Sequence, residues 1–530
     1  MPRATKSKRT PLEAARSGPL DRRTSGVLLH LTSLPGPHGS GDLGPAAHRF
    51  ADFLAESRQS WWQMLPVGPV GCGNSPYQAL SAFAGDPLLI SLAKLADDGL
   101  LDAKDLEPSR DLRRERVGYV AARRFRAARL RKAFAAFEAR RRPSERQRLE
   151  AFLAENESWL PDFALFSALR DAHPPGSWTA WPEELRARAP AALARARARF
   201  AGEIRYHQFL QLEFHRQWSE LRAHCRERGV GLIGDVPIFV AHDSADVWAH
   251  PRLFTVAPSG GLSSMAGVPP DYFSATGQLW GNPLYRWRVL RARGYDWWIA
   301  RLRSVTRAFD VARIDHFIGF HRAWALAPGA TTAERGRWVR GPGVAFFLRA
   351  RRALGRLPFI AEDLGLVVPE VKALRDRLDL PGMRVLQFAF GDDPEAKSYQ
   401  PHNYPRRCVV YTGTHDNDTT VGWFHDVGLR RRSTRSAQQI ERERGFALRY
   451  LGSDGREIHW DLIRLALMSV ADTAIIPMQD LLGLGSEARM NLPGTAEGNW
   501  EWRMRDEAAA DRVGERLARL TETYSRGAEP

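Results

Sequence analysis

Two stretches of this sequence place a carboxylate directly after a short apolar run, in combinations suited to nucleophilic and acid–base chemistry. Arg313 and Asp315 stand two residues apart, so they share one face of an extended strand. An arginine there lowers the pKa of the aspartate and keeps it ionised, as a nucleophile requires; a structural ion pair is the alternative. Glu362 follows the apolar residues 357–361, where partial burial raises the pKa of a glutamate and suits a general acid, unless it merely pairs with an arginine. One ionised and one protonated carboxylate on neighbouring strands form the pair that glycoside chemistry uses.

Other polar residues follow further apolar runs. His415 and Asp416 add a third carboxylate and a neutral hydrogen-bond donor. Asp235 could equally shape its own loop or belong to a site. We interpret Asp363 and Asp480 as turn formers or helix caps, which is the commoner role of an aspartate at the end of a strand.

Aromatic residues favour a sugar as the ligand, because sugar rings combine apolar CH faces with hydroxyl edges. The chain has 25 Phe, 17 Trp and 11 Tyr residues. Tyr77 lies in a turn-rich loop, and Tyr272, Phe273 and Trp280 lie in the Gly- and Pro-rich stretch 269–283. Exposed aromatic side chains on such a loop need a reason. Stacking on a ligand and packing against the mouth of the fold remain equal alternatives.

A regular series of elements has to position these residues. Eight apolar runs rich in Val, Ile, Leu and Phe are typical of parallel strands buried on both faces. They are residues 27–31, 61–67, 231–240, 309–314, 357–361, 383–390, 408–412 and 474–478. Helix-like segments lie between most of them. The alternation predicts an α/β protein of the (β/α)8 TIM-barrel class, and the acidic residues fall at the strand ends where barrel enzymes keep their active sites.

The uneven spacing of the runs predicts large, mostly helical insertions between the strands. We expect a helical subdomain at about 85–225 and an aromatic loop region at about 250–300. The barrel itself is expected to span residues 26–505. Residues 1–25 form a basic, disordered tail in this prediction, and residues 506–530 form a C-terminal helix and tail.

The net charge of +16 is local rather than general. Residues 1–25 hold seven Lys/Arg against two Asp/Glu, and residues 112–149 hold fourteen against three, so the rest of the chain is balanced. Leu130, Phe134 and Phe137 give the second block a helical spacing. We interpret this block as a solvated helix face, and expect no specific nucleic-acid partner.

Composition excludes several classes of protein. The chain of 530 residues is 44% hydrophobic and 26% charged, which is typical of globular proteins, and no apolar run approaches the ~18 residues of a membrane helix. Its three cysteines, Cys72, Cys225 and Cys408, lack metal-ligand spacing, so we expect no zinc site, no disulfide scaffold and a cytoplasmic location. Seven lysines, none at a strand end, argue against a Schiff-base cofactor.

The sequence resembles the 4-α-glucanotransferases of glycoside hydrolase family 77, also called amylomaltases or disproportionating enzymes, which are related to the α-amylases and share their barrel. The matching stretches occur in family order between residues 33 and 494. They are Ser33–Gly36, Asn74–Tyr77, Gly234–Pro237, Pro270–Pro283, Arg313–Phe317, Ala361–Gly365, Gly413–Asn417 and Arg489–Gly494. The resemblance implies a role in starch or glycogen metabolism and requires neither a cofactor nor a metal.

The resemblance also implies roles for individual residues. Asp315 matches the nucleophile, Glu362 the acid/base and Asp416 the stabiliser of the transition state. Arg313 and His415 match residues that support the reacting sugar, and Tyr77 matches the aromatic platform beneath it. We group Asp235 with them as a substrate-binding residue. The residues that match the loop on the acceptor side are Asp271, Tyr272, Phe273, Gln278 and Trp280.

The activity so implied is disproportionation of maltooligosaccharides and other α-1,4-glucans by a retaining double displacement. A covalent glucosyl-enzyme is resolved by the 4-hydroxyl of a second glucan, and cyclic products form when that hydroxyl belongs to the same chain. Retention predicts carboxyl groups of Asp315 and Glu362 about 5 Å apart. An α-glucan hydrolase with the same carboxylates is the closest alternative, and a non-catalytic glucan-binding protein is a more distant one.

Overall fold

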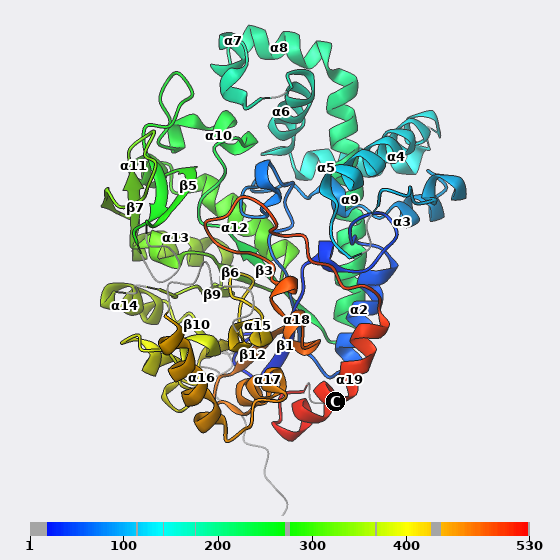
Figure 1. The fold of residues 1–530 in the computed structure, drawn as a ribbon. Coiled ribbons are helices and arrows are strands. Elements are labelled where there is room, and N and C mark those ends of the chain that lie inside the picture. The colour runs from blue at the N-terminus through cyan, green and yellow to red at the C-terminus, as the bar shows by residue number, and fades with distance from the viewer. Residues whose placement is uncertain are drawn as a thin grey trace, which may run out of the picture.

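Eight parallel strands close into a barrel at the centre of the molecule (Figure 1). The computed structural model describes residues 18–112, 115–140, 142–174, 176–270, 276–365, 368–425 and 436–527. The barrel strands are β1 (Thr24–Leu28), β2 (Trp61–Gln63), β3 (Gly231–Val236), β6 (Val311–Ile314), β9 (Phe359–Ala361), β10 (Gly382–Val385), β11 (Cys408–Tyr411) and β12 (Thr473–Pro477). Each overlaps one of the eight apolar runs, and the predicted TIM-barrel class is confirmed.

Almost all residues of these strands are buried, as expected for parallel strands whose two faces are both covered. The first and last strands close the barrel, with Thr24 opposite Thr473. Close approach of β1 to β2 requires a glycine at position 26, because a Cβ atom there would lie 2.3 Å from the carbonyl oxygen of Trp61.

Several strands are shorter than their apolar runs. The second run continues to residue 67, whereas β2 ends at Gln63 and the following Met64 and Leu65 remain buried in a loop. The sixth run continues past β10 into the 3-10 turn Leu386–Phe388. The loops that follow these strands are therefore packed into the core. Their apolar residues make the runs in the sequence longer than the hydrogen-bonded strands.

A helical insertion separates β2 from β3 and covers the upper part of the molecule in Figure 1. The long helix α9 packs against α6 and against α2 next to the barrel. The helices are α2 (Pro45–Glu56) before the insertion, then α3 (Leu92–Asp97), α4 (Tyr119–Arg140), α5 (Pro143–Glu155), α6 (Leu160–Ala172), α7 (Glu183–Arg186), α8 (Pro190–Arg199) and α9 (Ala201–Glu227).

The arginine-rich block 112–149 contributes α4 and the start of α5, and its charges have local partners. Arg126 is buried and donates to Asp42 Oδ2 at 2.9 Å and to the carbonyl of Ile90 at 2.8 Å. Arg131 pairs with Glu203 at 2.6 Å. Part of the positive charge of this block therefore holds the insertion to the barrel.

A second sheet lies beside the barrel and was not predicted. Residues 250–300, expected to form an aromatic loop region, include two strands of a four-stranded sheet in the order β5-β4-β7-β8. Its antiparallel strands are β4 (Met265–Val268), β5 (Gln278–Pro283), β7 (Arg322–Leu326) and β8 (Gly336–Arg340). The helices in this part of the chain are the short α10 (Ala245–Ala249) and α11 (Trp287–Ala292) and the longer α12 (Asp296–Ala308), which packs against β3 and β6 of the barrel.

The remaining helices surround the second half of the barrel, and α19 packs against α2 and α17 (Figure 1). They are α13 (Val344–Leu354), α14 (Pro369–Arg377), α15 (Thr420–His425), α16 (Ala437–Leu451), α17 (Ile458–Met468), α18 (Met478–Leu481) and α19 (Ala508–Thr523). Within the described residues no helix combines the length and the apolar character needed to cross a membrane. Residues 1–17 of the predicted basic tail lie outside the described residues, whereas Thr24 and Ser25 at its predicted end belong to β1.

Candidate active site

Three carboxylates meet at the carboxyl end of the barrel. Ile314 of β6 pairs with Ala361 of β9, so the residues that follow, Asp315 and Glu362, leave neighbouring strands at the same level. Asp416 lies in the loop after β11. All three line one cavity of about 480 Å³. Arg313, His415, Tyr77, Gln278 and Trp280 line the same cavity.

Arg313 is the centre of a buried network beneath this cavity. The register places Arg313 of β6 opposite Asp235 of β3. The guanidinium donates to Asp235 Oδ2 at 3.0 Å, to Asp315 Oδ1 at 2.8 Å and to the hydroxyl of Tyr77 at 3.2 Å. Tyr77 in turn donates to Asp235 Oδ2 at 2.8 Å. Asp235, whose side chain is fully buried, therefore anchors Arg313 and Tyr77 from below.

The net pKa shift of Asp315 is opposite to the one predicted from its arginine. Burial raises the pKa of Asp315 well above its usual value, and Arg313 opposes this shift. The carboxylates of Asp235, Glu362 and Asp416 raise the pKa of Asp315 further. The prediction assumed that Arg313 pairs with Asp315 alone. In the structure Arg313 forms ion pairs with both Asp315 and Asp235.

Glu362 has the raised pKa that suits a general acid. Burial raises the pKa of Glu362 to about 6, although Arg313 and two backbone hydrogen bonds lower it. Those bonds come from the N–H groups of His316 at 2.6 Å and Leu364 at 3.0 Å. His316 adopts a left-handed conformation, with φ of 49°, which is rare for a residue with a side chain. This conformation accompanies the hydrogen bond from its N–H to Glu362.

Asp416 is held by a segment that the sequence analysis left without a role. The Nδ2 group of Asn491 donates to Asp416 Oδ1 at 2.6 Å, and the N–H of Asn491 donates to the carbonyl of His415 at 3.0 Å. Arg489 binds the carbonyl oxygens of Asp416 at 2.5 Å and Asn491 at 2.7 Å. The quoted stretch Arg489–Gly494 was the only sequence signal for these contacts.

Three rings form a platform beside the carboxylates. The rings of Tyr77 and His415 stack with centroids 5.1 Å apart and planes 17° from parallel. The ring of Trp500 lies 5.8 Å from each of them. Burial lowers the pKa of His415 and raises the pKa of Tyr77 well above its usual value, so both are neutral hydrogen-bonding groups at neutral pH. Trp500 had no signal in the sequence, because it reaches the site only through the fold.

The acceptor-side residues are described in part. Gln278 and Trp280 lie on β5, where the Nε1 group of Trp280 donates to the Oε1 atom of Gln278 at 3.1 Å. The ring of Trp280 contacts the ring of His316, with centroids 4.7 Å apart and planes at 85°. The other predicted residues of this loop, Asp271, Tyr272 and Phe273, lie outside the described residues.

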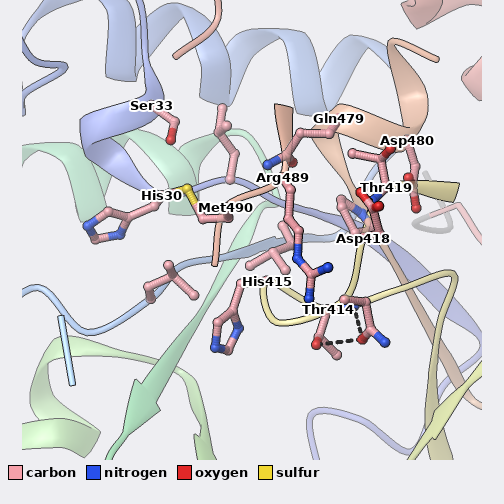
Figure 2. Close-up of a pocket in the computed structure, with 15 residues that line it drawn as sticks. His30, Ser33, Thr414, His415, Asp418, Thr419, Gln479, Asp480, Arg489 and Met490 are labelled. Atoms are coloured by element: carbon pink, nitrogen blue, oxygen red, sulfur yellow. Dashed lines mark hydrogen bonds between the residues drawn. The ribbon is translucent and has the colours of Figure 1, made fainter. Parts of the chain in front are cut away.

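A much smaller cavity shares His415 with the first one (Figure 2). Its volume is about 30 Å³, and His30, Arg489 and Met490 contribute to its lining. A space of this size is close to that of one water molecule and is too small for a sugar ring. The cavity of about 480 Å³, which the three carboxylates line, has the room that a sugar substrate needs.

The two aspartates interpreted as turn formers or helix caps have structural partners, but these lie on distant segments and not in their own turns. Asp480 accepts from the hydroxyl of Thr412 at 2.5 Å and from the N–H of Thr420 at 2.7 Å. Asp363 accepts from the N–H of Met383 at 2.7 Å and pairs with Arg375.

Comparison with known proteins gives matches over nearly the whole chain. The model of the family described as 4-alpha-glucanotransferase matches residues 29–509. The 4-alpha-glucanotransferase of Synechocystis sp. is 48% identical over 96% of this chain and 99% of its own length. That of Thermus thermophilus is 46% identical over 95% and 99%, respectively. The solved structure of amylomaltase from Streptococcus agalactiae in complex with acarbose has a TM-score of 0.90 and 36% identity, and covers 96% of this chain and 100% of that one. The resemblance drawn from the motifs is thereby confirmed, and the chain belongs to glycoside hydrolase family 77, the 4-alpha-glucanotransferase enzymes.

Proposed function

We propose that this protein is a 4-α-glucanotransferase that moves α-1,4-glucan segments to the 4-hydroxyl of an acceptor by a retaining double displacement. The observation that carries this proposal is the convergence of Asp315, Glu362 and Asp416 on one cavity beside an aromatic platform. Asp315 and Glu362 leave adjacent strands at the same level. Strand spacing of about 4.8 Å suits the short separation of carboxyl groups that retention needs.

In the first half-reaction, Asp315 attacks the anomeric carbon of the donor. Arg313 binds its Oδ1 atom, so we assign the attack to Oδ2. The bond from the anomeric carbon to the glycosidic oxygen breaks, and Glu362 gives its proton to that oxygen. The leaving glucan departs with a new 4-hydroxyl, and the donor segment stays on Asp315 as an ester.

In the second half-reaction, Glu362 is the base. It takes the proton from the 4-hydroxyl of the acceptor, whose oxygen attacks the anomeric carbon and displaces Asp315. Asp416, oriented by Asn491, binds hydroxyl groups of the reacting sugar while the sugar ring carries positive charge in the transition state. The two inversions restore the α-linkage, and Glu362 is protonated again.

Transfer rather than hydrolysis requires that a sugar hydroxyl outcompete water. The wall that Gln278 and Trp280 build on β5 favours this outcome, because it supplies contacts for an acceptor and reduces the space open to water. We assign α-1,4-glucans and maltooligosaccharides as substrates, residues 26–505 as the catalytic unit and the cytoplasm as the location. Cyclic products arise when the acceptor hydroxyl lies on the donor chain.

The product profile from maltotriose alone tests this proposal. We expect glucose and a ladder of longer maltooligosaccharides while the number of reducing ends stays constant. Rising reducing ends with glucose and maltose, and no ladder, would identify a hydrolase instead. The absence of any product would refute both assignments of activity.

A further inference from the structure

Trp338 is an aromatic side chain for which the reaction so far gives no role. It lies on β8, the edge strand of the four-stranded sheet, and is 37% exposed. Among the large apolar side chains exposed in the described ranges, it is the only aromatic one. It also lines the cavity that contains Asp315 and Glu362. An exposed indole that lines a cavity with three carboxylates needs a reason.

The ring of Trp338 is held in place from one side. The guanidinium of Arg322 lies 4.1 Å from its ring centroid, in a cation–π contact. Trp324, its partner in the strand register, contacts it with centroids 5.1 Å apart and planes at 62°. The Nε1 group of Trp324 is itself fixed on the carbonyl of Ala333 at 2.8 Å. Arg322 covers one face of the indole, and the exposed 37% of the side chain remains for a ligand.

Protection of an edge strand does not explain this side chain. Charged residues keep edge strands from pairing with other chains, and β8 already carries Arg337 and Arg340 on either side of Trp338. An exposed indole makes association of this edge with other chains more favourable, so protection of the edge does not account for Trp338 and a role in the cavity does.

The position of the sheet indicates which part of a glucan Trp338 would meet. Glu362 protonates the oxygen that joins the reacting sugar to the leaving chain, so the leaving and accepting chains lie on its side. Glu362 accepts from the N–H of His316, whose ring contacts Trp280 of β5 in the same sheet as Trp338. The Tyr77 platform belongs to the reacting sugar, whereas this sheet flanks the acceptor side.

We propose that Trp338, supported by Arg322, is an outer stacking platform on the acceptor side that makes the enzyme favour long acceptors. This inference rests on the proposed transferase function. The apolar face of a glucose unit at some distance from Glu362 stacks on the free side of the indole. A single glucose acceptor does not extend that far, so only longer acceptors gain from the contact.

The test compares acceptors of different length with starch as the common donor. Glucose, maltotriose and maltoheptaose, radiolabelled at the reducing glucose, are extended by wild type, Trp338→Ala and Trp338→Phe. Leu348→Ala is the matched control, because Leu348 is an exposed apolar residue of α13, 44% exposed, that does not line the cavity. We expect Trp338→Ala to raise the KM for maltoheptaose about 5-fold, to leave the KM for glucose and the kcat unchanged, and Trp338→Phe to lose less.

Other outcomes decide between the inference and the function beneath it. Unchanged KM values for both acceptors in Trp338→Ala would overturn the platform and leave the transferase standing. An equal rise for glucose and maltoheptaose would also overturn it, because the effect would then not depend on length. A wild-type enzyme that extends no acceptor would overturn the proposed function itself.

Discussion

The two ends of the barrel treat buried charge in opposite ways. At the carboxyl end, Asp235 and Asp315 share Arg313, and burial raises the pKa of Glu362 to about 6. At the amino end, Arg526 is fully buried, and its guanidinium donates to the carbonyl oxygens of Thr24, Leu467, Ser469 and Ala471 at 2.6–3.0 Å. The carboxyl end has more buried carboxylates than cations to pair with them. At the amino end, backbone carbonyl oxygens accept the hydrogen bonds of the buried guanidinium.

The difference separates chemistry from stability. Arg23 repeats the pattern of Arg526, with bonds to the carbonyls of Leu467, Ser469 and Tyr524 at 2.7–2.8 Å. Burial lowers the pKa of Arg526 to about 9, which still leaves it charged at neutral pH. Catalysis needs ionisable groups with shifted pKa values, and such groups lower the stability of the fold. Removal of a charge should therefore have opposite consequences at the two ends.

The largest expected effect is loss of activity at the carboxyl end. Asp315→Asn removes the nucleophile, so we expect kcat to fall by about 10⁴-fold or more while the Tm is equal to or above that of wild type. Initial rates with maltotriose and a thermal melt measure the two quantities. Asp376→Asn, at an exposed carboxylate of α14, serves as the control with full activity. Substantial turnover by Asp315→Asn would remove that residue from the mechanism.

The next effect is loss of stability at the amino end. Arg526→Ala removes a buried donor from four carbonyl oxygens, of which only those of Leu467 and Ser469 keep a bond to Arg23. We therefore expect the free energy of unfolding to fall by about 3–5 kcal/mol and the Tm by about 3–5 °C. The kcat at 25 °C should stay within twofold of wild type. Arg406→Ala removes an exposed partner of Asp472 at the same end and should cost less than about 1 kcal/mol. Equal melting of the two variants would contradict the role given to Arg526.

A smaller effect tests the support of Asp416. Asn491→Ala frees the Oδ1 atom of Asp416, so we expect kcat to fall about 10- to 100-fold with a smaller change in KM. Asn491→Asp places a second carboxylate beside Asp416 and should lower kcat further. Asn403→Ala, at an exposed amide, is the control. If KM alone rises in Asn491→Ala, the side chain binds substrate and does not orient Asp416.

The smallest effect concerns pH. Glu362 donates a proton in the first half-reaction, so kcat/KM should be high below its pKa of about 6 and fall tenfold per pH unit above it. Asp315 has to be ionised, and its raised pKa moves the acidic limb upwards, which narrows the profile. Arg313→Gln removes the cation that lowers the pKa of Asp315 and should shift the acidic limb higher still. A kcat/KM that stays flat from pH 5 to 8 would contradict the assignment of Glu362.

The sequence allowed the barrel and the three carboxylates to be predicted, because both depend on local signals. Buried parallel strands leave continuous apolar runs, and each carboxylate follows such a run. The four-stranded sheet escaped prediction because β4 and β8 contain glycine and few β-branched residues, and because β4 pairs with β7, which lies more than 50 residues further along the chain. Trp500 and Asn491 reach the site through loops whose course depends on the whole fold. The pKa of Asp315 escaped for a similar reason, since the sequence does not reveal that Asp235 shares its arginine.

Closure of the barrel has a consequence for synthesis of the chain. β1 pairs with β12, and Arg526 binds the carbonyl of Thr24 at 2.8 Å, so the first and last barrel strands complete one ring. A nascent chain on the ribosome that stops before residue 473 has seven of the eight barrel strands and two open sheet edges. Closure therefore waits until β12 has been translated, and until then the two open edges of the emerging chain can pair with other chains.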